Sequence, residues 1–472
     1  MFGLEFDIFI LLSIAIIAAC AFEFINGFHD TANAVATVIY TNSLKPTQAV
    51  IWSGIMNFLG VITGGVGVGL SIVNLLPVEL LVDQNVYQSI AMVLALLVSA
   101  IIWNFGTWYF GLPSSSSHTL IGAILGVGLG YALLPDNQMG IAAINWDKAK
   151  SVFTGLFLAP LIGFSLAIIL MFVIRWSVSK EIRQQITSEP KKNQMPPPWI
   201  RWTLVVTCTL VSFFHGRNDG QKGIGLMMLI LIGILPAYFA VNPNSDLGQL
   251  RPDIVRIEEA IQKIDTTYLA KVDIERVNQT LERTALLKDL SGKAKFSDTD
   301  NLEIRKDVLL ISNNVKKLIS NESINLSEAD KIMLEKLATK EEKGIRAFTD
   351  YAPFWVVLLI SLSLGLGTMI GWKRIVVTVG EKIGKSHLTY AQGASAELVA
   401  AATIGMASLG GLPVSTTHTL SSGIAGTMVA SKGVKNLQAG TIRNIAIAWV
   451  LTLPVSILLS AIFFLLFRWM LT

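Results

Sequence analysis

Four acidic residues lie inside otherwise apolar stretches of this 472-residue sequence, at Glu23, Asp30, Asp219 and Glu397. If those stretches cross a membrane, each carboxylate costs about 2.5–3.5 kcal/mol on insertion scales, so its presence there indicates a functional site. A buried carboxylate can bind a cation, exchange a proton or accept hydrogen bonds from a ligand. We assign this chemistry first to Asp30 and Asp219, which are aligned by the related segments NGFHDTANAVAT and HGRNDGQKGIGL. Glu397, and to a larger degree Glu23, could instead pair with a nearby polar group.

A run of hydroxyl residues followed by histidine occurs twice, 300 positions apart, as GLPSSSSHTL from Gly111 and GLPVSTTHTL from Gly411. Proline frees backbone groups, which membrane proteins tolerate only where the chain is buried in protein or lines a cavity. We therefore expect two re-entrant hairpin tips, each followed by a helix whose unpaired N–H groups favour a tetrahedral oxyanion. The hydroxyls at the two helix starts are those of Ser115, Ser116, Ser117, Ser415, Thr416 and Thr417. Helix packing through small residues is the alternative explanation.

Further polar residues accompany these motifs. Asn33 and Asn218 add neutral donors to the predicted anion site, and Lys222 adds a cation. His118 and His418 are repeat mates that could relay protons or orient hydroxyls, or could remain neutral and tie a broken helix to a carbonyl. His29 and His215 do not align with each other, so we expect a structural role for them. The cation-coupling set that we predict is Asp30, Asp219, Glu397, His118 and His418.

The composition indicates that membrane helices position these residues. Hydrophobic residues make up 52% of the chain and charged residues 15%, and 18 of 37 Lys and Arg and 20 of 33 Asp and Glu fall within 241–350. The residues outside 241–350 are organised as runs of 18 or more mostly apolar residues. This pattern predicts an all-α polytopic membrane protein with about ten to twelve spans. A soluble enzyme is nearly excluded, and no Lys/Arg run is dense enough to bind nucleic acid. Two isolated cysteines give no metal or disulfide framework.

The duplicated motifs divide the chain into two halves. Asp30 to His118 spans 88 residues and Asp219 to His418 spans 199, and the excess of 111 nearly equals the polar segment 241–350. Such duplication is usual in secondary transporters, often with inverted topology and with the substrate between the repeats. We predict a first repeat at 1–175 and a cytoplasmic polar linker at 176–200. The second repeat begins at 201–240, is interrupted by a helical extramembrane insert at 241–350, and continues at 351–472.

An enzymatic function is not supported by these residues. His29-Asp30 lacks companion metal ligands in the apolar region, and the Gly-x-Ser-x-Gly turn of serine hydrolases is absent from the sequence. Two equivalent half-sites also do not resemble the single differentiated triad that hydrolysis needs. A membrane-embedded hydrolase is therefore the weaker alternative, and a channel is a third.

At these residues the sequence resembles the PiT inorganic phosphate transporter family, and most closely its bacterial low-affinity Pit permeases. The resemblance rests on four motifs in order, FEFINGFHDTANAVATVIYTNSLKP, IIWNFGTWYFGLPSSSSHTLIGA, FFHGRNDGQKGIGLMMLILIGI and GLPVSTTHTLSS. It implies inverted repeats, a phosphate site between them and cation-coupled symport across the inner (cytoplasmic) membrane. The same fold could carry sulfate or arsenate, because hydroxyls and helix ends discriminate poorly among tetrahedral oxyanions.

One departure from the family bears on the coupling ion. Sodium-coupled relatives are expected to have a glutamate where this sequence has Asn57, although Glu397, the corresponding acid of the second half, is present. This difference favours protons over sodium, and the resemblance suggests that a divalent metal travels with phosphate as a neutral complex. We expect no resident cofactor or metal. Inorganic phosphate, the coupling cation and the lipid bilayer are the expected partners, and the oligomeric state stays open, a homodimer included.

Overall fold

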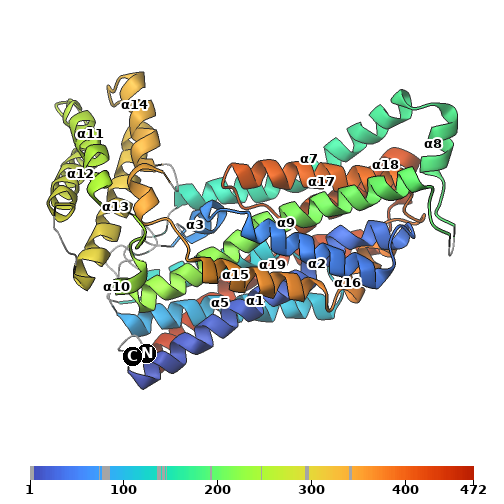
Figure 1. Cartoon of the computed structure of the whole chain (residues 1–472), viewed down its shortest axis with the longest axis horizontal. Helices are drawn as coiled ribbons and strands as arrows, with labels where there is room; N and C mark the ends of the chain where they lie inside the picture. Colours follow the sequence, from blue (N-terminus) through green and yellow to red (C-terminus); the bar gives the residue numbers. More distant parts are fainter. Residues whose placement is uncertain are drawn as a thin grey trace. The chain divides into compact units, whose positions relative to one another are not determined.

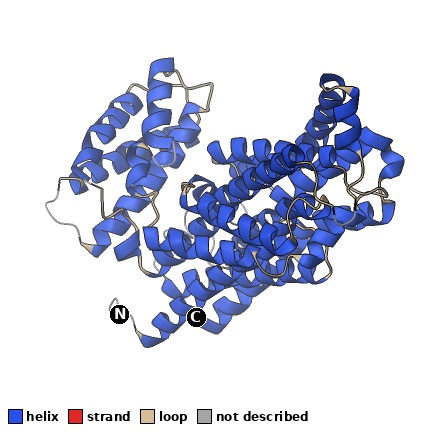
Figure 2. Ribbon diagram, turned by 45° about the vertical axis from the view of Figure 1, so that its right-hand side comes forward, coloured by secondary structure: helices blue, strands red, loops and turns tan. Residues whose placement is uncertain are grey.

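The computed structural model describes residues 5–73, 75–76, 85–135, 140, 144, 146–191, 194–245, 247–292, 297–339 and 343–471. Within these ranges the chain is almost wholly helical and forms no β-strand, apart from one isolated bridge between Gly384 and Leu437. Figure 2 shows the helices and the loops that join them. The predicted all-helical class is confirmed.

Two compact units make up the chain. The first comprises Met1–Pro77, Ile90–Met227 and Phe354–Thr472, and the second comprises Val78–Ser89 and Met228–Pro353. The predicted insert, 241–350, falls within the second unit. That unit also includes residues before and after it, so the five boundaries that we predicted remain predictions.

The first unit contains long helices together with several short ones (Figure 1). Its helices are α1 (Phe6–Tyr40), α2 (Pro46–Ile62), α3 (Gly67–Val73), α5 (Val86–Tyr109), α6 (Ser116–Ala132), α7 (Trp146–Ser177), α8 (Lys180–Thr187), α9 (Pro198–Ile234), α15 (Phe354–Thr368), α16 (Lys373–Val377), α17 (Tyr390–Leu409), α18 (Thr416–Lys432) and α19 (Ala439–Leu471). The ends of α5 and α9 extend beyond the first unit's bounds in sequence.

Four helices are long and apolar enough to cross a membrane, namely α1, α5, the Phe153–Ser177 part of α7, and α19. A fifth span arises if Phe354–Thr368 and Lys373–Lys382, bent by 53° from each other, are counted together. By this criterion the described residues give fewer spans than the ten to twelve that we predicted. The reason is physical: α6 and α18 have 17 residues each, which is short for a full span, and α9 has polar and charged residues in its middle.

The two halves of the first unit pack in a reciprocal manner. α6 packs against α19, while its sequence counterpart α18 packs against α7. α7 and α19 are themselves alike, with 32 and 33 residues and one internal proline each, Pro160 and Pro454. α1 packs against α2 and α15, and α2 also packs against α15. The exchange of partners agrees with two related halves.

Small residues let these helices touch backbone to backbone. A Cβ on Gly216 of α9 would overlap the carbonyl oxygen of Asn57 on α2, and a Cβ on Gly60 of α2 would overlap that of Phe213 on α9. Inside a bilayer, lipid tails are as apolar as the side chains, so close van der Waals packing holds helices together in place of the hydrophobic effect. The crossing of α2 with α9 therefore depends on glycine at both contact points.

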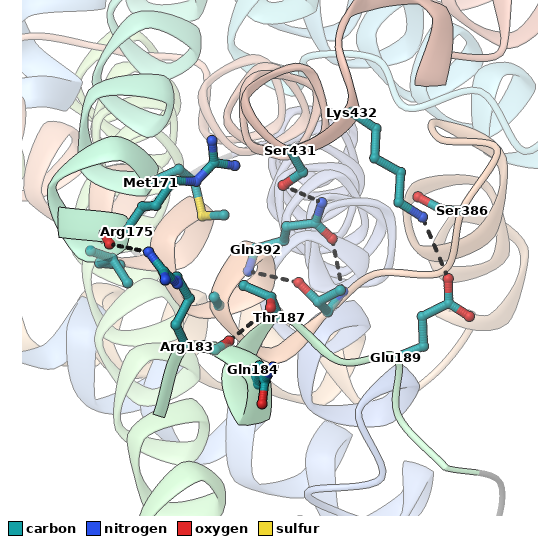
Figure 3. A pocket seen from close by; sticks show the side chains of 13 residues that line it. Met171, Arg175, Arg183, Gln184, Thr187, Glu189, Ser386, Gln392, Ser431 and Lys432 are labelled. Atoms are coloured by element: carbon teal, nitrogen blue, oxygen red, sulfur yellow. Dashed lines mark hydrogen bonds and ion pairs between the residues drawn. The ribbon is translucent and has the colours of Figure 1, made fainter. Parts of the chain in front are cut away.

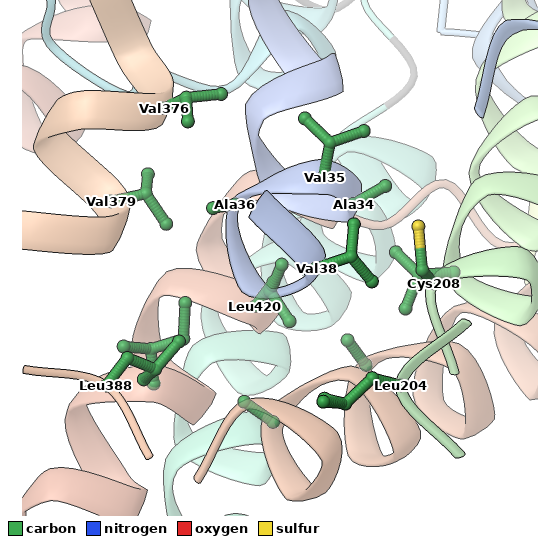
Figure 4. Close-up of a cluster of buried hydrophobic side chains, with 14 of the residues drawn as sticks. Ala34, Val35, Ala36, Val38, Leu204, Cys208, Val376, Val379, Leu388 and Leu420 are labelled. Atoms are coloured by element: carbon green, nitrogen blue, oxygen red, sulfur yellow. The ribbon is translucent and has the colours of Figure 1, made fainter. Parts of the chain in front are cut away.

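A hydrophobic cluster surrounds the carboxyl-terminal part of α1. Figure 4 shows Val35 and Val38 of α1 together with Leu204 of α9, Val379 and Leu420. All of these side chains are buried. The cluster fixes α1 against α9 and α18, the helices that carry most of the polar residues described below.

The second unit is a small helical domain with its own core. Its helices are α10 (Pro236–Phe239), α11 (Leu250–Gln262), α12 (Lys271–Leu290), α13 (Asp298–Ile319) and α14 (Glu328–Leu334). Apolar side chains at spacings of three and four, such as Ile254, Ile257 and Ile261, form its core, as the helical pattern predicts. The backbone N–H of Asn242 donates to the carbonyl of Phe348 at 2.8 Å, so residues near the two ends of the predicted insert, 241–350, lie side by side.

Candidate functional site

The two predicted tips have the same local geometry. Gly111 and Gly411 adopt φ values of 66° and 65°, a left-handed conformation that glycine tolerates best. Ser115 and Ser415 then cap α6 and α18, accepting hydrogen bonds from the backbone N–H groups of His118 and His418 at 3.2 and 3.1 Å. The repeated sequence thus gives two helix starts of equal design, each beginning with a pair of hydroxyl residues.

Asp30 of α1 is bound by both tips. Ser116 of α6 donates to Asp30 Oδ2 at 2.9 Å, and Thr417 of α18 donates to Asp30 Oδ1 at 2.5 Å. Ser116 also lies 3.4 Å from Asp219 Oδ2. Hydrogen bonds to a carboxylate are stronger than those between neutral groups. Asp30 therefore connects two hydroxyls that are about 300 residues apart in the sequence.

Lys222 supplies the cation of the cluster. Its ammonium lies 2.6 Å from Asp219 Oδ1, donates to Ser117 Oγ and to the carbonyl of Val414 at 3.3 Å, and is 3% exposed. Ser117 in turn donates to the carbonyl of Val414 at 3.0 Å. One lysine thus neutralises an aspartate of α9 and contacts both tips.

His215 is a site residue that sequence reasoning did not select. Its Nε2 lies 3.3 Å from Asp219 Oδ2 and 3.7 Å from Asp30 Oδ2, and its Nδ1 lies 3.1 Å from Asn57 Oδ1. Asp30, His215 and Asp219 each offer one ligand atom, all within 4.8 Å of one another. Two carboxylates and an imidazole suit a divalent transition metal. The expectation that Asp30 has no companion metal ligands in the apolar region was therefore wrong, since His215 and Asp219 are in position to be such ligands. The signal was in the sequence, because His215 precedes Asp219 by four positions and shares its helix face.

His29 also joins the cluster, where we expected only a structural role. Its Nδ1 lies 3.3 Å from Asp30 Oδ1 and its Nε2 lies 3.2 Å from the hydroxyl of Thr107 on α5. The carboxylate of Asp30 therefore has an imidazole on each side, from His29 and from His215. Both histidines are buried.

The repeat-related histidines His118 and His418 face each other. Their ring centroids are 4.4 Å apart, and the ring of His418 stacks on Trp449 at 3.9 Å. Among the residues that the structure describes, His118 Nδ1, His418 Nε2 and Thr416 Oγ1 are buried atoms without a hydrogen-bond partner. Buried polar atoms are rarely left unpaired, so these three are available to a ligand or to water.

Two predicted anion donors have different positions. Asn218 donates through Nδ2 to the carbonyl of Leu412 at 3.2 Å and accepts from the backbone N–H of Val414 at 3.5 Å, so it holds the second tip against α9. Asn33 lies in α1, but its side chain is outside the described residues.

Glu397 lies apart from the central cluster. Its carboxylate is fully buried and accepts from the hydroxyl of Thr37 on α1 and from that of Thr207 on α9, the latter at 2.5 Å. Thr37 is seven residues from Asp30, about 10 Å along the helix at 1.5 Å per residue. Glu23 pairs with the amide of Asn26 at 3.3 Å. The structure thus places the Glu397 carboxylate in a buried polar site that is separate from the tips.

These features define a class of protein before any comparison. Apolar helices long enough to span a membrane enclose a buried cluster of carboxylates, hydroxyls and one lysine, built from both halves of the chain. Ionisable groups at membrane depth mark substrate or ion pathways, and broken helices beside them are typical of transporters. The protein is a membrane transporter.

The chain belongs to the phosphate transporter family, whose model matches residues 26–460. It is 42% identical to the low-affinity inorganic phosphate transporter of Buchnera aphidicola subsp. Acyrthosiphon pisum, over 96% of this chain and 95% of that protein. It is 40% identical to the low-affinity inorganic phosphate transporter PitA of Escherichia coli strain K12, over 97% of both chains. Membership of this family agrees with the sequence-based expectation of a transporter and not an enzyme.

A solved structure titled the sodium-dependent phosphate transporter has the same fold. The match has a TM-score of 0.53 at 20% identity and covers 97% of this chain and 98% of that one. At this identity the comparison supports the fold alone.

Proposed function

We propose that this protein imports inorganic phosphate by cation-coupled symport, with the anion held between the two tips. The observation that carries the proposal is that Ser116 and Thr417, one from each tip, converge on Asp30. The two helix starts provide hydroxyls and N–H dipoles for phosphate oxygens, and Lys222 provides a positive charge. Alternating access would expose this cluster to one side and then the other.

Coupling to a cation follows from the charge of the substrate. Against an inside-negative potential of order 100 mV, each negative charge that enters costs about 2.3 kcal/mol, so divalent phosphate faces nearly 5 kcal/mol. Asp30, Asp219 and Glu397 are the proposed cation carriers, with His118 and His418 as proton relays. The buried position of Glu397 between two threonine hydroxyls supports this role, because a carboxyl there can be neutralised by a proton without another partner.

Protons are the coupling ion that we favour over sodium. Asn57 occupies the place of an expected sodium-site acid, and its amide is used by neighbours: Oδ1 faces His215 and Nδ2 donates to Thr368 at 2.9 Å. A neutral amide held in this way provides no charge for sodium. A divalent cation that accompanies phosphate would bind as cargo at Asp30, His215 and Asp219, which offer a suitable ligand set. We place the protein in the inner membrane, as expected from its bacterial relatives.

Uptake by proteoliposomes tests the proposal. Initial rates of phosphate uptake should rise with an inward proton gradient and be indifferent to sodium at constant pH. Glu397→Gln should weaken the proton dependence more than phosphate binding. Phosphate flux that does not saturate and ignores both gradients would identify a channel instead, and preferential uptake of sulfate or arsenate would reassign the substrate.

A further inference from the structure

A cationic cavity lies in the first unit, away from the tips. It has a volume of about 330 Å³ and is lined by the ends of α7, α8 and α18 and by the start of α17 (Figure 3). Arg175, Arg183 and Lys432 line it, with Glu189 as the acidic residue among its lining side chains. The cavity therefore has more positive than negative charge, which favours an anion.

The two arginines are held in place by backbone acceptors. Arg175 donates from Nη2 to the carbonyl of Ala430 at 3.3 Å, and Arg183 donates from Nη1 to the carbonyl of Arg175 at 3.1 Å. A guanidinium has five N–H donors in a planar fork, so both keep donors for a bidentate contact with a phosphate group. Lys432 and Glu189 are 3.7 Å apart and both more than half exposed, which makes their ion pair weak.

An apolar groove of about 300 Å³ lies next to this cavity. The cavity and the groove share Ile174 and Ala391 as lining residues, and the groove is lined further by apolar side chains such as Leu170, Leu204 and Leu398. Its lining residues come from α7, α8, α9 and α17. A charged cavity beside an apolar groove matches a ligand with an anionic head and a hydrocarbon chain.

The position of both compartments along the helices agrees with a membrane interface. The apolar span Phe153–Ser177 ends beside Arg175, and Trp176, next to it, is 82% exposed. At the start of α9, Trp199 lines the groove and Trp202 is exposed. Tryptophan and arginine gather at the level of lipid headgroups. The groove then follows α9 toward Thr207, away from these interfacial residues.

We propose that an anionic phospholipid binds at this place. Its phosphate lies among Arg175, Arg183 and Lys432, and one acyl chain lies along the apolar groove. The groove reaches Thr207, whose hydroxyl donates to Glu397. A bound acyl chain therefore covers the contact between Thr207 and the Glu397 carboxylate. The lipid that occupies the groove then affects the surroundings of that carboxylate.

Lipid titration of the purified full-length protein tests this proposal without measuring transport. Delipidated protein is titrated with phosphatidylglycerol or with phosphatidylcholine of the same acyl chains, and bound lipid is counted by native mass spectrometry. Phosphatidylglycerol should bind more tightly, and Arg175→Gln with Arg183→Gln should weaken it about tenfold. Lys180→Gln removes one charge from α8 outside the cavity and should change nothing, whereas Arg183→Gln, which removes one charge from the cavity, should weaken binding. Glu189→Gln should strengthen binding.

A second series separates a lipid from a soluble anion. Glycerol phosphate carries the headgroup chemistry without a chain and should bind at least tenfold more weakly than phosphatidylglycerol. Ala394→Leu narrows the groove and should weaken binding of the lipid but not of glycerol phosphate. Three results would each overturn the proposal: equal affinity for the two lipids, equal affinity for phosphatidylglycerol and glycerol phosphate, or unchanged lipid binding by the arginine variants. If the double arginine variant does not fold, Arg183→Gln alone serves, since this side chain lies on the short exposed helix α8.

Discussion

The two repeat-related aspartates should differ in what they do for stability. The Asp219 carboxylate and the Lys222 ammonium are 2.6 Å apart, with side-chain exposures of 0% and 2%. Removal of one partner of a buried ion pair costs about 3–5 kcal/mol, because the other charge is left uncompensated. In Asp219→Asn, Lys222 keeps Ser117 and the carbonyl of Val414, so we expect the lower end, about 3 kcal/mol.

Asp30→Asn should cost less. Among the described residues Asp30 has no lysine or arginine partner, and its contacts are hydroxyls and histidines. The amide retains one acceptor oxygen, so we expect a loss of about 1–3 kcal/mol from weakened hydrogen bonds. Both variants should abolish coupled phosphate uptake, since both carboxylates belong to the proposed site.

Thermal unfolding of the detergent-solubilised protein, followed by tryptophan fluorescence, separates these expectations. Asp219→Asn should unfold at a lower temperature than Asp30→Asn. The double variant Asp219→Asn with Lys222→Met removes both charges, so it should regain most of the lost stability while remaining unable to transport. Equal midpoints for the two single variants, or a double variant less stable than Asp219→Asn, would refute the reasoning from the buried pair.

Three further predictions concern the helix crossings and the insert. Gly216→Ala should reduce the amount of folded protein because its Cβ overlaps the Asn57 carbonyl, while Gly440→Ala, with open space around it, should not; size-exclusion profiles compare them. Replacing 243–347 by a short Gly-Ser linker should leave phosphate uptake measurable, and loss of uptake by a monodisperse variant would make the insert part of the mechanism. Burial raises the pKa of Asp307 to about 6, so its stabilising contribution is present below pH 4 and lost as pH rises through 6. As the pH rises from 4.5 to 7.5, the unfolding midpoint of Asp307→Asn should therefore rise relative to that of the unmodified protein.

The residues of the two tips could be predicted from the sequence because a duplication marks them. Identical spacing of Gly, Pro, hydroxyl and His in two places specifies two similar turns, and the structure has the same φ and the same cap in both. The aspartates were visible for a different reason, since a carboxylate in an apolar run is costly. Where the signal was local or repeated, the sequence was sufficient to locate the turns and caps of the tips.

The partners of those residues could not be predicted in the same way. Thr37 and Thr207 are 360 and 190 positions from Glu397, and nothing in their own segments distinguishes them from other helix threonines. Asn218 satisfies the backbone of a tip 194 positions away, a contact that only the packed helices reveal. Helical periodicity places His215 on the same helix face as Asp219, but His215 has no repeat mate, so we expected only a structural role for it.

The glycine contact between α2 and α9 also has a genetic consequence. Every single-nucleotide change that replaces glycine introduces a side chain, and at Gly60 or Gly216 even alanine meets the backbone of the opposite helix. At these two codons, no single-nucleotide missense change is conservative. In a mutational scan selected for growth on limiting phosphate, they should be among the least tolerant positions, although neither carries a side chain that could touch the transported ion.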